Sequence, residues 1–206
     1  TEVDFALISI NESTGQISVS SVTNLHGSQT FTVTAKDGQS ANDRVNRDFT
    51  LTVTAVNDVP VVTDQSVNTN EDVAVQVTLS ASDVEGDPLT YSIVTDPSKG
   101  TVSLSGSVVT YIPNADYNGD DSFTFKVNDG KVDSNPRTVS ISVASVNDAP
   151  VFTSEPVTVA TEDTGYSYPI EALDVDAGDE LLITASTLPA WLELEDNGDG
   201  TGALLG

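Results

Sequence analysis

The chain contains an internal repeat of about 90 residues, which limits the folds it can adopt. Residues 55–61 (AVNDVPV) recur as residues 145–151 (SVNDAPV), and residues 31–38 match residues 123–130 at an offset of 92. A period of this length is too long for a solenoid unit, which needs its neighbours for a core, and suits a self-contained domain repeated in tandem. We therefore divide the chain into three segments: 1–58, 59–148 and 149–206.

Within the central segment, apolar and polar residues alternate, which is the pattern of half-buried β-strands. Val75 and Val77 follow this period of two, as do Phe123, Phe125 and Val127. Runs rich in Val, Thr and Ser suit strands, and they end at Asp-Gly, Asn-Gly or proline turns. About seven short strands in one repeat are typical of a β-sandwich. We predict an all-β chain of tandem Greek-key sandwiches, with central strands near residues 61–67, 73–80, 88–95, 100–105, 107–113, 122–129 and 136–146.

The two outer segments match only part of the repeat. Residues 1–58 correspond to its later strands, and residues 149–206 correspond to its earlier ones. Neither segment is expected to bury a full core alone. Two interpretations stay open. The chain is an excerpt of a longer repetitive protein, which the absence of an initiator methionine favours, or the tail of one chain packs on the head of the next in a heterologous contact.

The charge balance narrows the choice of partners. The chain has 32 acidic and 7 basic residues, which gives a formal net charge of −25. A field this negative repels phosphate backbones and anionic headgroups, so we expect no binding to nucleic acid and no membrane insertion. No apolar run approaches the roughly 20 residues of a membrane-spanning helix. The partners that such a surface favours are cations.

The acidic residues recur as short clusters in the predicted loops. Because the loops of a sandwich gather at its two ends, we expect several carboxylates to meet where one repeat joins the next. Two carboxylates about 4 Å apart repel by roughly 4 kcal/mol at an effective dielectric constant near 20, whereas a whole domain has about 5–15 kcal/mol of stability. A metal ion is the predicted counter-charge, since the chain has no base after Arg137. The clusters are Glu71-Asp72, Asp83/Glu85/Asp87, Asp116 with Asp120-Asp121, Asp129, Asn147-Asp148, Glu162-Asp163 and Asp174/Asp176/Asp179.

The available ligands select the kind of metal. The chain has no cysteine and a single histidine, His26, so zinc and copper are poorly served. Oxygen atoms from Asp, Glu and Asn suit a hard cation. Calcium accepts about six to eight of them in irregular geometry, whereas magnesium keeps several of its waters. We therefore predict Ca²⁺ as the cofactor, with a dissociation constant of roughly 0.1–1 mM at sites of this kind.

The junction segments also resemble a known family. Residues 57–60 (NDVP) and 147–150 (NDAP) are similar to the Asp-x-Asn-Asp-x-x-Pro linker of cadherin repeats, and residues 5–17 resemble the cadherin strand–turn–strand pattern that ends in Thr-Gly-x-Ile. The pattern is similar to bacterial cadherin-like tandem repeats of large surface and secreted proteins. Residues 188–192 (LPAWL) resemble the dystroglycan-type subfamily. The resemblance implies Ig-like/cadherin-like sandwiches in an extracellular, secreted or cell-surface protein of a bacterium.

The resemblance also implies which residues bind the metal. Departures from the family pattern weaken the first junction, because Asn24 and His26 stand where the preceding domain would supply acids. We therefore expect stronger binding at the second junction, around Asn147 and Asp148. The implied ligands are Glu71, Asp116, Asn147, Asp148, Asp174 and Asp176 at the second junction, and Asn57, Asp58, Asp83, Glu85 and Asp129 at the first.

Two functions from different classes follow. The leading one is a calcium-stiffened spacer and adhesion segment whose partners are the adjacent repeats, and also a second copy of the protein or a polysaccharide. The alternative is a calcium-dependent carbohydrate-binding module of a secreted polysaccharide-degrading or adhesive protein, with Tyr166, Tyr168 and Trp191 as the aromatic platform. An enzyme is not expected, since no nucleophile motif and no Gly-rich phosphate loop is present.

Overall fold

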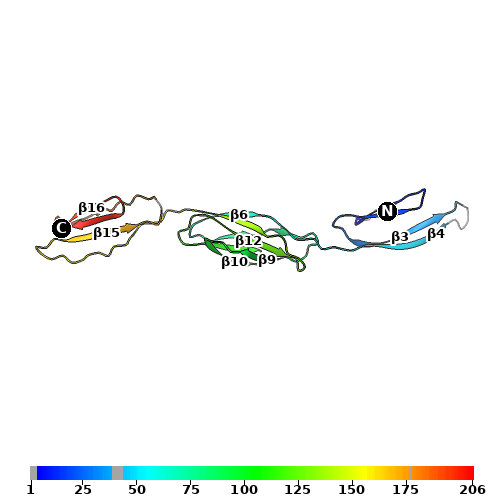
Figure 1. Ribbon diagram of the computed structural model, residues 1–206, viewed down its shortest axis with the longest axis horizontal. Helices are drawn as coiled ribbons and strands as arrows, with labels where there is room; N and C mark the ends of the chain where they lie inside the picture. The colour runs from blue at the N-terminus through cyan, green and yellow to red at the C-terminus, as the bar shows by residue number, and fades with distance from the viewer. Residues whose placement is uncertain (1–3, 39–43, 177) are drawn as a thin grey trace.

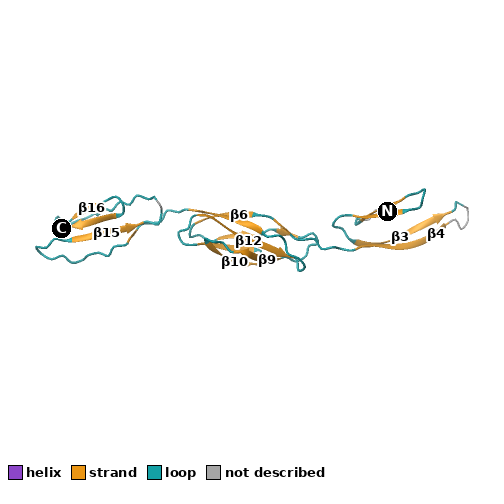
Figure 2. Cartoon of the chain, in the orientation of Figure 1, coloured by secondary structure: helices purple, strands orange, loops and turns teal. Residues whose placement is uncertain are grey.

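The computed structural model describes residues 4–38, 44–176 and 178–206, which form 17 β-strands. Figure 1 shows three groups of strands in an elongated row, with the two termini at opposite ends. The described residues are strands, turns and loops (Figure 2), so the predicted all-β fold is confirmed. Among them, no helix is long and apolar enough to cross a membrane. The linkers 54–60 and 145–150 lie outside any strand.

The central module is a sandwich of two sheets. One sheet has four strands in the order β6-β13-β12-β9, in which β6 runs parallel to β13 and the other pairs are antiparallel. The facing sheet has three antiparallel strands in the order β10-β11-β7. The bounds are β6 Gln65–Asn70, β7 Val75–Thr78, β9 Thr90–Thr95, β10 Gly100–Ser105, β11 Val108–Pro113, β12 Gly119–Asn128 and β13 Arg137–Ala144.

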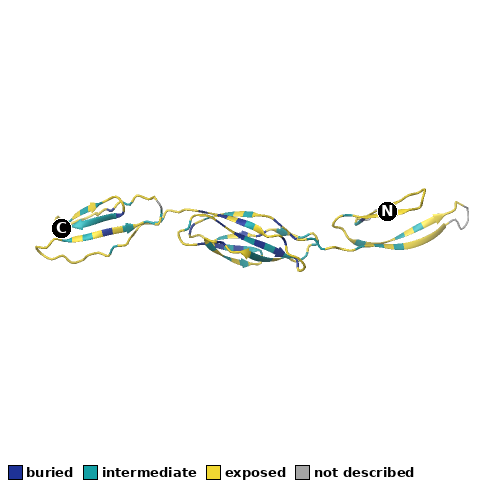
Figure 3. Ribbon diagram, in the orientation of Figure 1, coloured by how far each residue is buried: buried dark blue, intermediate teal, exposed yellow. Residues whose placement is uncertain are grey.

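The core of the central module comes from the alternation seen in the sequence. Phe123, Phe125 and Val127 of β12 are buried, and the residues between them face outward or are half-buried. Val109 and Tyr111 of β11 meet them from the other sheet, and both are fully buried. Figure 3 shows that the buried positions concentrate in this module. The module therefore has the closed apolar core that positions the loops at its two ends.

The predicted strand 61–67 is corrected by the structure. The segment divides into β5 (Val61–Val62), which pairs with β8 (Ala81–Ser82), and β6, which pairs with β13 in the other sheet. The chain changes sheets at residues 63–64. The Asp64 carboxylate accepts a hydrogen bond from the backbone N–H of Thr138 at 2.8 Å, and Arg137 donates to the carbonyl of Val62 at 3.2 Å. These side-chain contacts replace the ladder bonds where the strand is interrupted.

Asp121 is a second difference from the sequence-based interpretation, which placed it in a solvated loop. It lies in β12 and is 9% exposed. Its carboxylate accepts hydrogen bonds from the backbone N–H groups of Ser98, Lys99 and Ser122 and from the Tyr111 hydroxyl, at 2.9–3.0 Å. Burial raises the pKa of Asp121, but these hydrogen bonds outweigh it and hold the pKa below its usual value. Asp121 therefore ties the loop before β10 to β12.

The N-terminal segment consists of two antiparallel hairpins. In the longer one, Phe31 and Phe49 stack with their ring centroids 5.4 Å apart. Ala6 is the buried apolar residue among the described residues of this segment. The bounds are β1 Ala6–Ile10, β2 Ile17–Ser21, β3 Gly27–Lys36 and β4 Arg44–Val53.

The C-terminal segment is a single four-stranded sheet in the order β14-β15-β17-β16. Residues 197–200 form the turn between β16 and β17, where the Asp199 carboxylate accepts a hydrogen bond from the Thr201 N–H at 3.0 Å. Ile170 and Ile183 are its buried apolar residues within the described part. The bounds are β14 Val151–Phe152, β15 Ser167–Leu173, β16 Glu193–Asp196 and β17 Thr201–Leu205.

Candidate metal centre

Four separate parts of the chain meet at the second junction, which joins the central module to the C-terminal segment. Residues 71–72 follow β6, and residue 116 lies in the loop between β11 and β12. The linker residues 147–148 follow β13, and residues 174–179 follow β15. Since β6, β11 and β13 all end at this side of the sandwich, the fold places their polar ends together. A cavity of about 450 Å³ lies beside them, lined in part by Asn147, Asp148, Asp174 and Asp179.

The carboxylates at this junction form three overlapping trios. In each trio, one oxygen from each residue lies within 4.8 Å of the others. The trios share Asp148 and Asp176, so together they form a continuous group that we call the second-junction cluster. Among the described residues, no lysine or arginine forms an ion pair with any of its members. The trios are Glu71/Asp148/Asp176, Asp72/Asp116/Asp148 and Asp174/Asp176/Asp179.

Glu71 is the most buried member of the cluster, with 3% of its surface exposed. One of its carboxylate oxygens accepts a hydrogen bond from the backbone N–H of Val146 at 2.6 Å, and the other is 3.5 Å from the side-chain amide of Asn118. The Glu71 N–H in turn donates to the carbonyl of Ala144 at 2.9 Å. Glu71 is thereby fixed against the start of the linker that carries Asp148.

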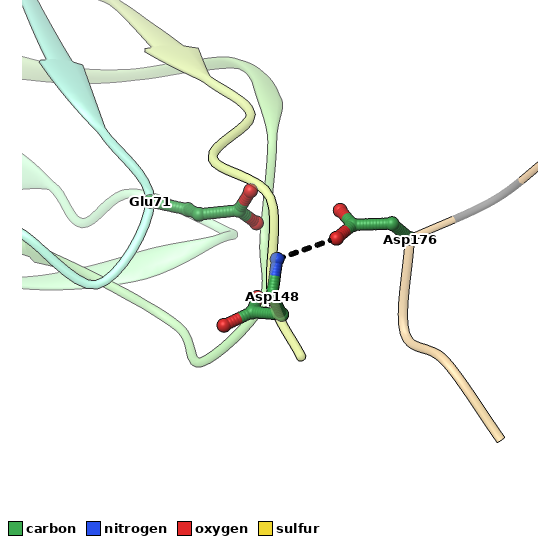
Figure 4. A group of neighbouring side chains, drawn as sticks. All are labelled: Glu71, Asp148 and Asp176. Carbon is green, nitrogen blue, oxygen red and sulfur yellow. Dashed lines mark hydrogen bonds between the residues drawn. The ribbon is translucent and has the colours of Figure 1, made fainter. Parts of the chain in front are cut away.

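Asp176 reaches the linker from the following segment. Its carboxylate accepts a hydrogen bond from the backbone N–H of Asp148 at 2.7 Å. Figure 4 shows the carboxylates of Glu71 and Asp176 facing each other across the linker. The Asn147 side-chain amide donates to the carbonyl of Asp148 at 2.7 Å, which stiffens the linker locally. The Asp176 N–H also donates to Asp174 at 2.9 Å, so this loop is held by its own acids.

Two members of the cluster adopt an unusual backbone conformation. Asp72 and Asp116 have φ angles of 59° and 55°, in the left-handed region that few residues other than glycine adopt, although Asp and Asn do so more readily. The N–H of Asp116 donates to the Asp72 carboxylate at 3.3 Å. The two turns thus hold a pair of exposed acids against each other at the end of the central module.

The electrostatics of Asp148 reflect its central place in the cluster. Burial raises its pKa above the usual 3.8, and the negative charges of four other cluster members raise it further: Asp116, Asp176, Asp72 and Glu71. A proton on Asp148 is therefore more favourable than usual, which is the behaviour of a carboxylate without a counter-charge. A bound cation would remove the same repulsion.

The donor set fits calcium. Two oxygens that each lie about 2.4 Å from one calcium ion are at most about 4.8 Å apart, which matches the spacing of each trio. The ligand atoms are all oxygens, and they come from loops and a linker at several points of the chain. Calcium accepts such irregular oxygen sets, while zinc and copper favour His or Cys ligands and magnesium requires near-ideal octahedral geometry.

The first junction uses the same linker residues with different contacts. The Asn57 side-chain amide donates to the Asp129 carboxylate at 2.7 Å and to the carbonyl of Asp58 at 3.0 Å. The N–H of Asp58 donates to Glu85 at 3.1 Å. Lys131 donates to the Asn57 side-chain oxygen at 2.9 Å and forms an ion pair with Asp87 at 2.7 Å. A lysine therefore stands among the acids of this junction.

The Asp129 carboxylate accepts three hydrogen bonds from within the protein. It accepts from the N–H groups of Val132 and Lys131 at 2.7 Å each, in addition to the Asn57 amide. The backbone donor of Val132 and the side chain of Asn57 lower the pKa of Asp129 to about 2. This acid is stabilised in its charged form by the protein itself.

The structure brings together the sequence-predicted ligands of the second junction and leaves those of the first less gathered. Within the described residues, no three carboxylates of the first junction approach one another as closely as the trios do. Asp83 accepts from the N–H of Asp87, and its other oxygen is buried without a hydrogen-bond partner. Asn24 and His26 line a cavity of about 210 Å³ with Asp58 and Glu85. The acids that line this cavity are Asp58 and Glu85, so its lining does not supply the three carboxylates of a trio.

Sequence reasoning assigned no role to Lys131, and it did not name Asp72 or Asp179 as ligands. Both acids belong to acidic clusters identified in the sequence, Glu71-Asp72 and Asp174/Asp176/Asp179, so taking every acid of these clusters as a ligand would have found them. Lys131 lies two residues after Asp129 in a turn, but 74 residues from Asn57. A sequence pattern gives no sign of a contact over that separation.

The aromatic residues of the C-terminal segment do not form a flat platform. Tyr166 and Trp191 meet edge to face, at an interplanar angle of 84°. The Tyr168 hydroxyl is engaged with Ser154, at 2.9 Å from its side-chain oxygen. Trp191 is 56% exposed. Tyr166 and Tyr168 are half-buried, so Trp191 is the exposed ring of the three.

Comparison with known proteins supports the fold. Residues 57–142 match the bacterial Ig domain family, a range that spans most of the central module. The chain is 30% identical over 162 residues to integrin beta-like protein A of Dictyostelium discoideum, in an alignment that covers 69% of this chain and 8% of that protein. The predicted Ig-like fold of the central repeat is thereby confirmed.

Two solved structures share the arrangement of the chain. The protocadherin gammaB4 extracellular domain has a TM-score of 0.54 at 17% identity, over 100% of this chain and 36% of that one. Protocadherin gamma B2 extracellular cadherin domains 1–5 give 0.52 at 17% identity, over 100% and 44%. This likeness shows a cadherin-like fold. The chain spans less than half the length of each of these relatives.

Proposed function

We propose that the second-junction cluster binds calcium and that the bound ions fix the central module relative to the segment that follows it. The observation that carries this proposal is the set of three overlapping carboxylate trios that share Asp148 and Asp176. Glu71, Asp72 and Asp116 come from the central module, Asp148 from the linker, and Asp174, Asp176 and Asp179 from the next segment. An ion held between them joins all three parts.

Calcium would stabilise the junction by neutralising the charge of the carboxylates in the second-junction cluster. Each residue supplies carboxylate oxygens, and Asp148 and Asp176 each belong to two trios, so they can bridge neighbouring ions. The metal supplies the positive charge that the described chain lacks at this place. A ligand at a concentration 100-fold above its dissociation constant stabilises the bound form by about 2.7 kcal/mol. That gain is enough to hold a flexible linker in one orientation.

As a whole, the chain is proposed to serve as a calcium-stiffened spacer and adhesion segment of a large extracellular or cell-surface protein. Support comes from the bacterial Ig match of residues 57–142 and from the cadherin-like arrangement of modules in a row. The repeated Asn-Asp linkers and the dystroglycan-type pattern near Trp191 favour bacterial cadherin-like repeats. The proposed partners are the adjacent repeats, and the proposed role is non-catalytic.

Spin labels across the second junction test the proposal. The chain has no cysteine, so Thr101→Cys and Thr184→Cys at exposed positions can be labelled without background. Double electron–electron resonance is expected to give a broad distance distribution in EGTA and a narrow one in about 10 mM calcium, at least tenfold above the predicted dissociation constant. In the same pair with Asp148→Ala, the distribution stays broad. Identical distributions with and without calcium would contradict the proposal.

A further inference from the structure

Lys131 lies at the meeting point of the linker and the central module. It stands in the turn after β12, and its ammonium group has two acceptors from different parts of the chain. One is the side-chain oxygen of Asn57 in the linker, at 2.9 Å, and the other is the carboxylate of Asp87 in the loop after β8, at 2.7 Å. The side chain therefore bridges the linker to the module.

The bridge completes the hydrogen bonding of Asn57. An asparagine side chain offers two N–H donors and one carbonyl acceptor. The donors of Asn57 reach Asp129 and the carbonyl of Asp58, and its acceptor takes Lys131. Every kind of polar group on this side chain is thus paired within the protein. The linker is held at this residue by the ammonium group on one side and by Asp129 on the other.

Lys131 is also surrounded by acids. The hydrogen bond to Asp87 raises its pKa, and the charges of Asp87, Asp129 and Glu85 add to the effect. These acids belong to the end of the central module that faces the first junction. The ammonium group consequently lies between the linker and the carboxylates at this end of the module.

We propose that Lys131 is the resident cation of the first junction and that it fixes this joint without a metal ion. The proposal goes beyond the calcium function of the second junction and does not depend on it. An isolated exposed ion pair contributes little, and the Lys131 side chain is 57% exposed. Here, however, the ammonium group joins Asn57 of the linker to Asp87 of the central module. Its loss therefore releases the linker as well as the Asp87 carboxylate.

Spin labels at two exposed positions on either side of the first junction test this inference in the full chain. Ser20→Cys lies in β2 and Ser105→Cys lies at the end of β10. The expected distance distribution is narrow and is the same in EGTA and in calcium. With Lys131→Gln, the distribution in EGTA is expected to lose its single narrow maximum. A merely structural role of Lys131 would lower the unfolding temperature but leave the distribution unchanged.

Lys126→Gln is the matched control, because Lys126 pairs with Asp133 at 2.5 Å and has no contact with the linker. It is expected to leave the distribution narrow. The inference is overturned if the parent distribution broadens in EGTA, or if Lys131→Gln leaves it narrow. Failure of the calcium proposal gives a different signature: the Thr101/Thr184 pair at the second junction then does not respond to calcium, while Lys131→Gln still broadens the Ser20/Ser105 distribution.

Discussion

The two junctions share one backbone design and differ in their charges. In both, the linker asparagine donates to the carbonyl of the next residue, at 3.0 Å for Asn57 and 2.7 Å for Asn147. In both, the N–H of the linker aspartate donates to an acid of the following module, Glu85 in the first junction and Asp176 in the second. The repeat therefore reproduces the geometry of the joint, and the side chains around it decide how the charge is balanced.

The two junctions differ in the charged side chains that surround the linker. At the first junction Asn24, with a φ angle of 60°, takes the place that Asp116 has at the second, with a φ angle of 55°. A lysine is present at the first junction, whereas seven carboxylates without a described basic partner gather at the second. The first junction thus contains a basic side chain, whereas the second gathers carboxylates that a bound cation would neutralise.

The largest effect is expected at an acid that belongs to neither junction. Asp121→Ala removes the acceptor of three backbone N–H groups and leaves the buried Tyr111 hydroxyl with the more distant carbonyl of Lys99, at 3.4 Å. The expected loss is about 3–5 kcal/mol in the free energy of unfolding, equal in EGTA and in calcium. Urea denaturation measures it, with the neighbouring exposed Asp120→Ala as control. A calcium-dependent loss would show that Asp121 is linked to the metal.

The next effect compares the two linker aspartates. Asp148→Ala removes a residue shared by two trios, so the stabilisation by calcium, about 2.7 kcal/mol at 100-fold excess over the dissociation constant, is expected to disappear. Asp58→Ala, at the equivalent position of the first linker, is expected to keep it. Thermal unfolding with and without calcium checks both variants. Equal losses in the two would remove the distinction between the junctions.

The pH dependence without metal is expected to have opposite signs at the two junctions. Burial and neighbouring charges raise the pKa of Asp148 above 3.8 in the folded state, so the native protein binds more protons there and stability falls as pH rises through that window. The pKa of Asp129 is lowered to about 2, so its contribution is full above 3.8 and is lost as pH falls toward 2. Urea denaturation in EGTA between pH 3 and 7, on the parent and on Asp148→Asn, measures the first effect. A parent curve that matches Asp148→Asn would contradict it.

The smallest change in stability is expected when the second junction is made to resemble the first. Asp116→Asn removes one carboxylate from the Asp72/Asp116/Asp148 trio. Asparagine tolerates the left-handed backbone conformation of this position. Because Asp72 and Asp116 are exposed, we expect a gain in stability without metal of under about 1 kcal/mol, together with weaker calcium binding. The reciprocal Asn24→Asp is the control at the first junction. Tighter calcium binding by Asp116→Asn would be inconsistent with the account.

The strands of the central module, the positions of the joints and the acidic clusters could be predicted from the sequence, because they depend on local patterns. The period of two in residues 123–127 gave a strand with a buried face, and the repeat of the Asn-Asp linker located the joints. The gathering of acids at the ends of the modules follows from the sandwich architecture, which collects loops there. Glu71, Asp148 and Asp176 could therefore be named as candidates before their distances were known.

The features that escaped prediction depend on contacts between distant residues. Asp121 stands in an acidic stretch that looks solvated, and only the fold shows the donors from residues 98–99 that justify its burial. The change of sheets at residues 63–64 depends on Asp64 and Arg137, which are 74 and 75 residues from their partners. The role of Lys131 depends on a contact with Asn57 across 74 residues. Propensity and periodicity contain no information about such pairs.

Isothermal titration of calcium into the full chain decides whether the second-junction cluster binds the metal. We expect heat of binding with a dissociation constant of roughly 0.1–1 mM, and the loss of that heat in both Asp148→Ala and Asp174→Ala. Lys131→Gln, at the first junction, is expected to keep the binding seen in the parent. No heat from the parent chain up to about 10 mM calcium, or undiminished heat from Asp148→Ala, would contradict the claim that the second-junction cluster is a calcium site.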